Sequence, residues 1–262
     1  MRYSIRLSYD GSAFCGWQIQ NNAVSVQGTL EKALSTLCGQ DIQVTGAGRT
    51  DTGVNAINYI AHFEITGDAA PEAELLCYKL NAMLPREIVI HEICEVSEEF
   101  HARFNATSRE YHYFIHFKKD PFAEKFSYRM RYPLDIEAIN KAASLLLGEH
   151  DFSCFEKTGG NNATSICTIT EAGWSTYLPA HCRMMGTDWK EGDYIVFRIK
   201  ANRFLRNMVR AIVGSLIEVG RGKQKPSWIA DLIANGNRSD AGTSVPGKAL
   251  FFCGASYGDG EK

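Results

Sequence analysis

The stretch Gly46–Asn55 (Gly-Ala-Gly-Arg-Thr-Asp-Thr-Gly-Val-Asn) combines one carboxylate, one guanidinium and three glycines. Glycine lets the backbone adopt positive φ and approach a ligand closely, so this composition indicates a loop shaped for more than packing. In an extended segment Arg49 and Asp51 point to the same side, where the guanidinium can hydrogen-bond the carboxylate and keep it ionised. Such a carboxylate suits a base or a nucleophile. Taken alone, an ordinary polar turn with a surface ion pair is the simpler interpretation.

A second group of candidate residues lies on the expected strand 108–117. Arg109, Tyr111 and Tyr113 share one face of that strand because side chains alternate along it. Two aromatic rings beside an arginine can form a stacking platform for a nucleic-acid base. The alternative is a pair of core tyrosines whose hydroxyls reach the surface.

A third group is basic. Seven Lys and Arg residues lie between Lys200 and Lys225 against the single acid Glu218, which favours a phosphate backbone as partner. Arg203, Arg206 and Arg210 fall on one face of an expected helix, whose N-terminal end would attract an anion. A solvated helix face is the alternative.

The elements that position these residues follow from hydrophobic periodicity. In the first half we expect strands at 3–9, 42–46, 57–65 and 88–96 and helices at 26–37 and 71–84, with Ser25 as N-cap and Gly39 as the helix stop. Asp51 then lies on a connection between two strands, and residues 14–18 form a loop with exposed aromatic rings. In the second half we expect strands at 108–117, 166–174, 194–201 and 250–257 and helices at 136–147, 206–219 and 227–234.

This order predicts an α+β fold of two ferredoxin-like, RNA-recognition-like halves, residues 1–105 and 106–262, each with an antiparallel sheet and helices on one face. The net charge of −2 is uneven, because residues 1–105 carry 7 Lys and Arg against 13 Asp and Glu, and the rest carry 21 against 17. Neither an export signal nor a membrane span is indicated, so we expect a cytoplasmic protein. The eight cysteines lack metal-ligand spacing, and we expect reduced core residues and no metal site.

Six short sequence motifs occur along the chain in a fixed order. They are Tyr9-Asp10-Gly11, Gly16-Trp17-Gln18, the block from Gly48 to Val54, Phe100-His101-Ala102-Arg103-Phe104, Arg109-x-Tyr111-x-Tyr113, and Phe204-x-x-x-Met208-Val209-Arg210-x-Ile212-Val213-Gly214. In this order they resemble the TruA-type tRNA pseudouridine synthases over nearly the whole chain. Departures are Ile19, Asn55, and Gly-Gly-Asn-Asn at 159–162, and they concern how the tRNA body is held.

The resemblance implies two halves joined in one continuous, mainly antiparallel sheet with a central catalytic cleft. It also implies cofactor-free isomerisation of uridine to pseudouridine at positions 38 to 40 of the tRNA anticodon stem-loop. The resemblance implies that Asp51 is the catalytic carboxylate and that Arg210 pairs with it. It implies that the ring of Tyr111 stacks on the base and that its hydroxyl takes the C5 proton. It further implies that Arg49 contacts RNA or props open the stack when the nucleotide is flipped, and that Leu250 lines the uracil pocket.

The expected partners are tRNA and a second copy of the chain. A homodimer is expected because Asp51 lies in the acidic half, whereas the concentrated positive charge lies beyond residue 200, and the resemblance points to the same assembly. Two other classes stay open. A non-catalytic RNA-binding module would use the same basic segment but has no need of a carboxylate beside RNA. A nucleotide-handling enzyme could use Gly46–Gly53 as a phosphate cradle, although the loop lacks the Gly-Lys-Ser/Thr ending.

Overall fold

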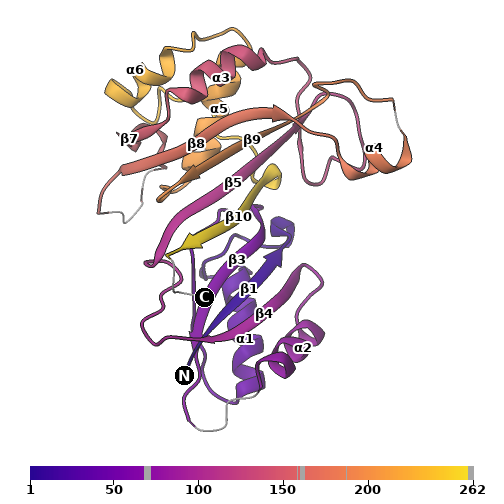
Figure 1. Ribbon diagram of the computed structural model, residues 1–262, viewed down its shortest axis with the longest axis vertical. Coiled ribbons are helices and arrows are strands. Elements are labelled where there is room, and N and C mark those ends of the chain that lie inside the picture. The colour runs from indigo at the N-terminus through magenta and orange to yellow at the C-terminus, as the bar shows by residue number, and fades with distance from the viewer. Residues whose placement is uncertain (68–71, 158, 160–162, 187, 259–262) are drawn as a thin grey trace. The chain divides into compact units, whose positions relative to one another are not determined.

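The computed structural model describes residues 1–67, 72–157, 159, 163–186 and 188–258. The chain forms two compact units, Met1–Arg109 together with the segment from Phe251, and Glu110–Leu250 (Figure 1). The sequence places the boundary after residue 105 and assigns the last strand to the second half. In the structure the last strand pairs with the strand Asn55–Glu64.

The first unit contains a sheet in the order β4-β1-β3-β10, with β2 added to β3. Its strands are β1 (Arg2–Tyr9), β2 (Val44–Gly46), β3 (Asn55–Glu64), β4 (Ile88–Val96) and β10 (Leu250–Tyr257). β1 is antiparallel to both neighbours, and Ile5 lies opposite Ala61 of β3 and Ile93 of β4. β10 runs parallel to β3, with Phe251 opposite Asn55.

Two helices complete this unit, α1 (Val26–Cys38) and α2 (Ala73–Met83). α1 begins where predicted, because the Ser25 hydroxyl accepts a hydrogen bond of 3.2 Å from the Gly28 amide, and it ends at Gly39, whose φ is 66°. The expected start of the second helix at Pro71 lies outside the described residues.

One face of β1 forms the core of the first unit. Every second residue of the strand is buried, namely Tyr3, Ile5, Leu7 and Tyr9, and the alternate residues are polar and partly exposed. This is the alternation of a strand with one covered face, and it leaves the opposite face of the strand polar.

The second unit has a sheet in the order β5-β9-β8-β7 and three packed helices beside it (Figure 1). Its strands are β5 (Ala106–His116), β6 (Tyr128–Arg129), β7 (Gly148–Asp151), β8 (Ile166–Thr176) and β9 (Tyr194–Ala201). Its helices are α3 (Ile136–Ser144), α4 (Ala180–Met185), α5 (Met208–Gly220) and α6 (Trp228–Asn235). β8 is antiparallel to β7 and to β9, where Trp174 lies opposite Phe197.

Helix α5 is buried along nearly all of its length, as expected of a helix that is apolar on every side. Its Gly214 contacts residues 242–243 so closely that a Cβ there would lie 1.9 Å from the Thr243 carbonyl oxygen. The Gly242 amide also donates to the Ser215 hydroxyl at 2.8 Å. The segment that follows, toward Leu250, is therefore positioned by α5.

The α+β class and the mainly antiparallel pairing are confirmed. The short elements β6, β7 and α4 were not predicted, because two to six residues give no usable periodicity. All eight cysteines are free thiols, but only Cys154, Cys167 and Cys182 are buried, so the prediction of core residues is right for three of them. In the described part of the chain, no helix has the length and apolar character needed to cross a membrane.

Candidate active site

Asp51 lies on the connection between β2 and β3, as predicted, and is half-buried. These two strands pair antiparallel, with Gly46 opposite Ala61, so both ends of the loop are anchored in the sheet. Thr50 is buried between exposed Arg49 and half-buried Asp51, which is the alternation expected of extended backbone.

Two glycines of the first unit press against this loop. A Cβ on Gly16 would lie 2.3 Å from the Thr50 carbonyl oxygen, and one on Gly11 would lie 2.1 Å from the Val54 carbonyl oxygen. Only glycine allows such approaches, and Gly16 also has a φ of 88°. The Trp17 amide donates to the Thr50 carbonyl at 3.2 Å. The backbone around Asp51 is therefore held from a second, distant part of the sequence.

Buried aromatic rings support the same loop. Trp17 packs on Tyr59 with ring centroids 4.2 Å apart, and the Tyr9 ring lies 5.6 Å from Tyr59. The Tyr9 and Thr50 hydroxyls are hydrogen-bonded at 2.9 Å, and the Tyr59 hydroxyl donates to the Gly48 carbonyl. This corrects the expectation of exposed rings at 14–18, because Phe14 is 5% and Trp17 is 3% exposed. The residues that cover these rings lie far away in the sequence, so a local sequence pattern cannot reveal that the rings are buried.

Arg109 is bound to backbone carbonyls. Its Nε and Nη2 donate to the Ala47 carbonyl at 3.3 and 3.2 Å, Nη1 donates to the Ala106 carbonyl at 2.8 Å, and Nη2 also donates to the Arg103 carbonyl. The guanidinium thus ties the start of the glycine-rich loop to the turn before β5. Its role in binding the substrate, beside the two tyrosines of this strand, stays a prediction.

In the second unit, β5 carries Tyr111 and Tyr113 on one face, as predicted. Tyr111 is 8% exposed and meets the Phe204 ring edge-on, with centroids 5.1 Å apart. Tyr113 is fully buried, its hydroxyl donates to the Pro246 carbonyl at 3.1 Å, and burial raises its pKa. Tyr113 is therefore a core residue, which leaves Tyr111 as the candidate for chemistry on this strand.

Arg210 lies in the first turn of α5. Its Nε donates to the Val245 carbonyl at 2.7 Å, and the Val245 amide donates to the Arg210 carbonyl at 3.2 Å. The guanidinium is thereby oriented by the segment that packs on Gly214. The same segment leads through a short helical turn to buried Leu250, the first residue of β10.

The basic stretch is not a single helical face. Arg203 and Arg206 precede α5, which begins at Met208 because Asn207 adopts the left-handed conformation with a φ of 63°. Lys200 belongs to β9 and Arg210 to the helix itself. Arg221, Lys223 and Lys225 follow the C-terminus of the helix, and the first two of these pair with Glu218. A helix of 13 residues separates the two groups by about 20 Å.

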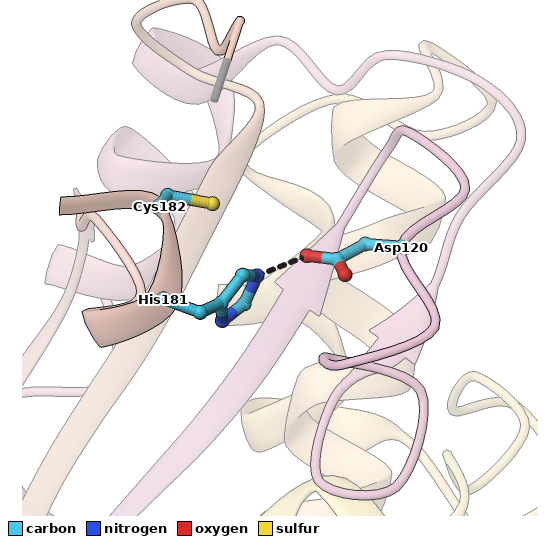
Figure 2. Close-up of side chains that lie close together, drawn as sticks. All are labelled: Asp120, His181 and Cys182. Atoms are coloured by element: carbon cyan, nitrogen blue, oxygen red, sulfur yellow. Dashed lines mark hydrogen bonds and ion pairs between the residues drawn. The ribbon is translucent and has the colours of Figure 1, made fainter. Parts of the chain in front are cut away.

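One cluster in the second unit has side chains of metal-ligand type. Figure 2 shows Asp120, His181 and Cys182, whose potential ligand atoms lie within 4.8 Å of one another. The His181 Nε2 lies 2.7 Å from Asp120 Oδ2, which also accepts from the Tyr194 hydroxyl at 2.8 Å. The sequence did not reveal this cluster because 61 residues separate Asp120 from His181. Hydrogen bonds account for its geometry, because two ligands of a tetrahedral metal lie farther apart than 2.7 Å.

Comparison with known proteins extends these observations. A family model described as tRNA pseudouridine synthase matches residues 6–105 and 142–258. A protein named tRNA pseudouridine synthase A from Bacteroides fragilis is 44% identical over 257 residues, which are 98% of this chain and 96% of that protein. A protein of the same name from Parabacteroides distasonis is 45% identical over 98% of this chain and 96% of its own length. Another from Halalkalibacterium halodurans is 39% identical over 95% of this chain and 90% of its own length.

Proposed function

The chain belongs to the tRNA pseudouridine synthase family, and on this premise we propose that it isomerises uridine to pseudouridine in the anticodon stem-loop of tRNA, at positions 38 to 40, with Asp51 as the catalytic carboxylate. One observation carries the assignment of Asp51. Its half-buried carboxylate lies in a loop whose backbone is fixed by close contacts at Gly11 and Gly16. Such fixing suits a group that must meet a reacting atom in one geometry.

The reaction is an isomerisation, so atoms and electrons balance without a co-reactant. The bond from C1′ of the ribose to N1 of uracil breaks, the freed base rotates, a bond from C1′ to C5 forms, and the proton on C5 is lost while N1 gains one. A carboxylate can assist in two ways, by adding to C1′ or by removing the proton at C2′. In either case Asp51 must be ionised when the base leaves.

The proposed partners of Asp51 come from the second unit. Arg210, oriented by its hydrogen bond to Val245, would pair with the carboxylate. Tyr111 would stack on the uracil and take the C5 proton, and Leu250 would close the apolar wall of the pocket. The buried positions of Tyr111 and Leu250 support this, because a site that excludes water strengthens its charge interactions.

The remaining site residues would hold the RNA. Arg49, two residues before Asp51, would contact the strand from which the uridine is flipped, and its exposure supports this. Arg203 and Arg206 would bind phosphates. Because Arg109 binds three backbone carbonyls, we infer that it supports substrate binding by holding the glycine-rich loop.

We further propose that the enzyme works in the cytoplasm as a homodimer in which one tRNA contacts both chains. The charge distribution supports this, because the basic residues near α5 and the acidic region around Asp51 must serve the same polyanion. A mixture of Asp51→Asn chains with chains lacking Arg203, Lys223 and Lys225 tests it. Restored activity requires two chains per tRNA. A monomer by light scattering at working concentration, with no restoration, contradicts the dimer.

The reaction itself is tested with a tRNA transcript labelled with tritium at C5 of uridine, incubated with the enzyme without metal or nucleotide. Release of tritium is expected, because C5 loses its hydrogen when the new bond forms. An RNA-binding module would bind the transcript without release, and a nucleotide-handling enzyme would act only when a nucleotide is added. Tyr111→Phe is expected to keep base stacking and to stall the reaction before release. Normal turnover of that variant would exclude its hydroxyl as the proton acceptor.

A further inference from the structure

Three aromatic rings, those of His62, His101 and Phe104, pack one on the next from the core of the first unit to its surface, and we call them the ring ladder. His62 is 7% exposed, its ring lies 4.8 Å from that of His101, and the His101 ring lies 4.3 Å from that of Phe104. The Phe104 ring is 76% exposed, and the Arg103 guanidinium lies 5.7 Å from its centroid. The outermost ring thus presents an apolar surface to solvent beside a positive charge.

Hydrogen bonds hold the turn that carries Phe104. The His101 Nδ1 accepts from the amides of Arg103 and Phe104, both at 3.2 Å, and the His62 Nδ1 accepts from the Ala102 amide at 3.1 Å. Burial lowers the pKa of both histidines, that of His62 to about 4. Both imidazoles are therefore neutral at pH 7, and Nδ1 keeps the lone pair that these hydrogen bonds require.

The turn is also joined to the catalytic loop. The same nitrogen of Arg109, Nη2, donates to the Arg103 carbonyl and to the Ala47 carbonyl. These two oxygens therefore lie at most about 6 Å apart, two hydrogen-bond lengths. Ala47 is four residues before Asp51, so the ring ladder stands beside the loop to which we assign the chemistry.

We propose that Phe104, with Arg103 beside it, is a stacking platform for an unpaired RNA base next to the target uridine. This rests on the proposed function and assigns a role to the Phe100–Phe104 motif. A flat ring held rigidly at the surface accepts a base of any sequence, and an adjacent guanidinium can neutralise the phosphate that follows.

The test uses full-length protein in the Asp51→Asn background, so that binding is measured without turnover. The probe is an anticodon stem-loop RNA with 2-aminopurine placed at one loop position at a time, because stacking quenches its fluorescence. Phe104→Ala and Phe104→Leu are expected to abolish quenching at one or two positions and to weaken binding about tenfold. Phe104→Tyr should behave like the parent, because it keeps the ring.

Phe122→Ala is the matched control. Its ring is 74% exposed and also lies against a histidine, His181, with centroids 5.5 Å apart, but it belongs to the second unit. This variant should leave quenching and affinity unchanged. All variants should keep the parent's melting temperature, because the replaced rings are exposed.

Two results would overturn the proposal. Quenching and affinity of Phe104→Ala equal to those of the parent would show that the ring does not stack on RNA. Conversion of the chain to a smaller species by Phe104→Ala, seen by light scattering without RNA, would assign the ring to an interface between copies. These outcomes are separable from the proposed function, since tritium release by the parent is measured independently.

Discussion

The backbone of Gly16 passes so close to Thr50 that a Cβ at residue 16 would lie 2.3 Å from the Thr50 carbonyl oxygen and 3.1 Å from the Asp51 carbonyl carbon. The glycine also has a φ of 88°, which disfavours any other residue. The peptide unit that precedes Asp51, the carboxylate to which we assign catalysis, thus lies in contact with a distant loop. A shift of the backbone at Gly16 must therefore also shift the peptide unit before Asp51.

Gly16→Ala is therefore expected to lower kcat about a hundredfold, because a displacement of about 1 Å at a reacting group has that effect. Gly39→Ala is the control. Gly39 also has a positive φ, of 66°, but a Cβ there would meet nothing within 4 Å. It should cost about 1 kcal/mol of unfolding free energy and leave kcat unchanged. Equal kcat values for the two variants in a tritium-release assay would show that the contact does not position Asp51.

Local elements of the fold could be predicted from the sequence, whereas the contact of Gly16 with the Asp51 loop could not. Ser25, Gly39 and the alternation of β1 are local signals, and the helix and strand they predicted are present. The position of Asp51 between two strands was predicted for the same reason. The support of its loop by Gly16, Trp17 and Tyr59 was not, because it depends on contacts between segments far apart in the chain.

The same distinction applies in the second unit. The helix expected from Arg206 begins at Met208, because left-handed Asn207 interrupts the pattern that the arginines follow. The contact of Arg210 with Val245 spans 35 residues and leaves no trace in periodicity. The resemblance to a family named Arg210, and the structure supplies the hydrogen bond that orients it.

Arg206 and Arg109 should affect RNA binding differently. Arg206 is exposed and is expected to bind a phosphate, so Arg206→Ala should weaken binding and reduce the slope of log K against log salt by about one unit. Arg109 is bound to backbone carbonyls, so Arg109→Ala should lower kcat and leave the slope unchanged. Fluorescence titration at several salt concentrations measures both.

Lys141→Ala is the control for the salt series, because Lys141 is paired with Glu137 on α3 and has no assigned RNA contact. It should leave the slope unchanged. A slope for Arg206→Ala equal to the parent's would place that guanidinium away from the phosphates. A reduced slope for Arg109→Ala would mean that Arg109 contacts RNA directly.

His62, the buried member of the ring ladder, predicts a pH dependence of the unfolding free energy. Burial, with help from His101 and Arg2, lowers the pKa of His62 to about 4, below its ordinary value of 6.5. The unfolded chain then binds more protons between these values, so the unfolding free energy falls as pH drops from 6.5 toward 4. One proton contributes at most about 1.4 kcal/mol per pH unit.

His62→Asn should remove this contribution, because the amide oxygen can still accept from the Ala102 amide but does not titrate. Urea unfolding at pH 7, 6 and 5 measures the difference between parent and variant. The unfolding free energy of the parent should fall relative to that of the variant as pH decreases. A constant difference would show that His62 does not titrate in this range.

The most direct measurement compares Asp51→Asn with Asp41→Asn in the tritium-release assay, alongside their affinities for the same tRNA. Asp41 is an exposed carboxylate just before β2, so its variant controls for the loss of one negative charge in the same unit. We predict that Asp51→Asn binds tRNA and unfolds like the parent but releases no tritium, whereas Asp41→Asn releases it at the parent's rate. Release by Asp51→Asn within tenfold of the parent would contradict the assignment of the reaction to that carboxylate.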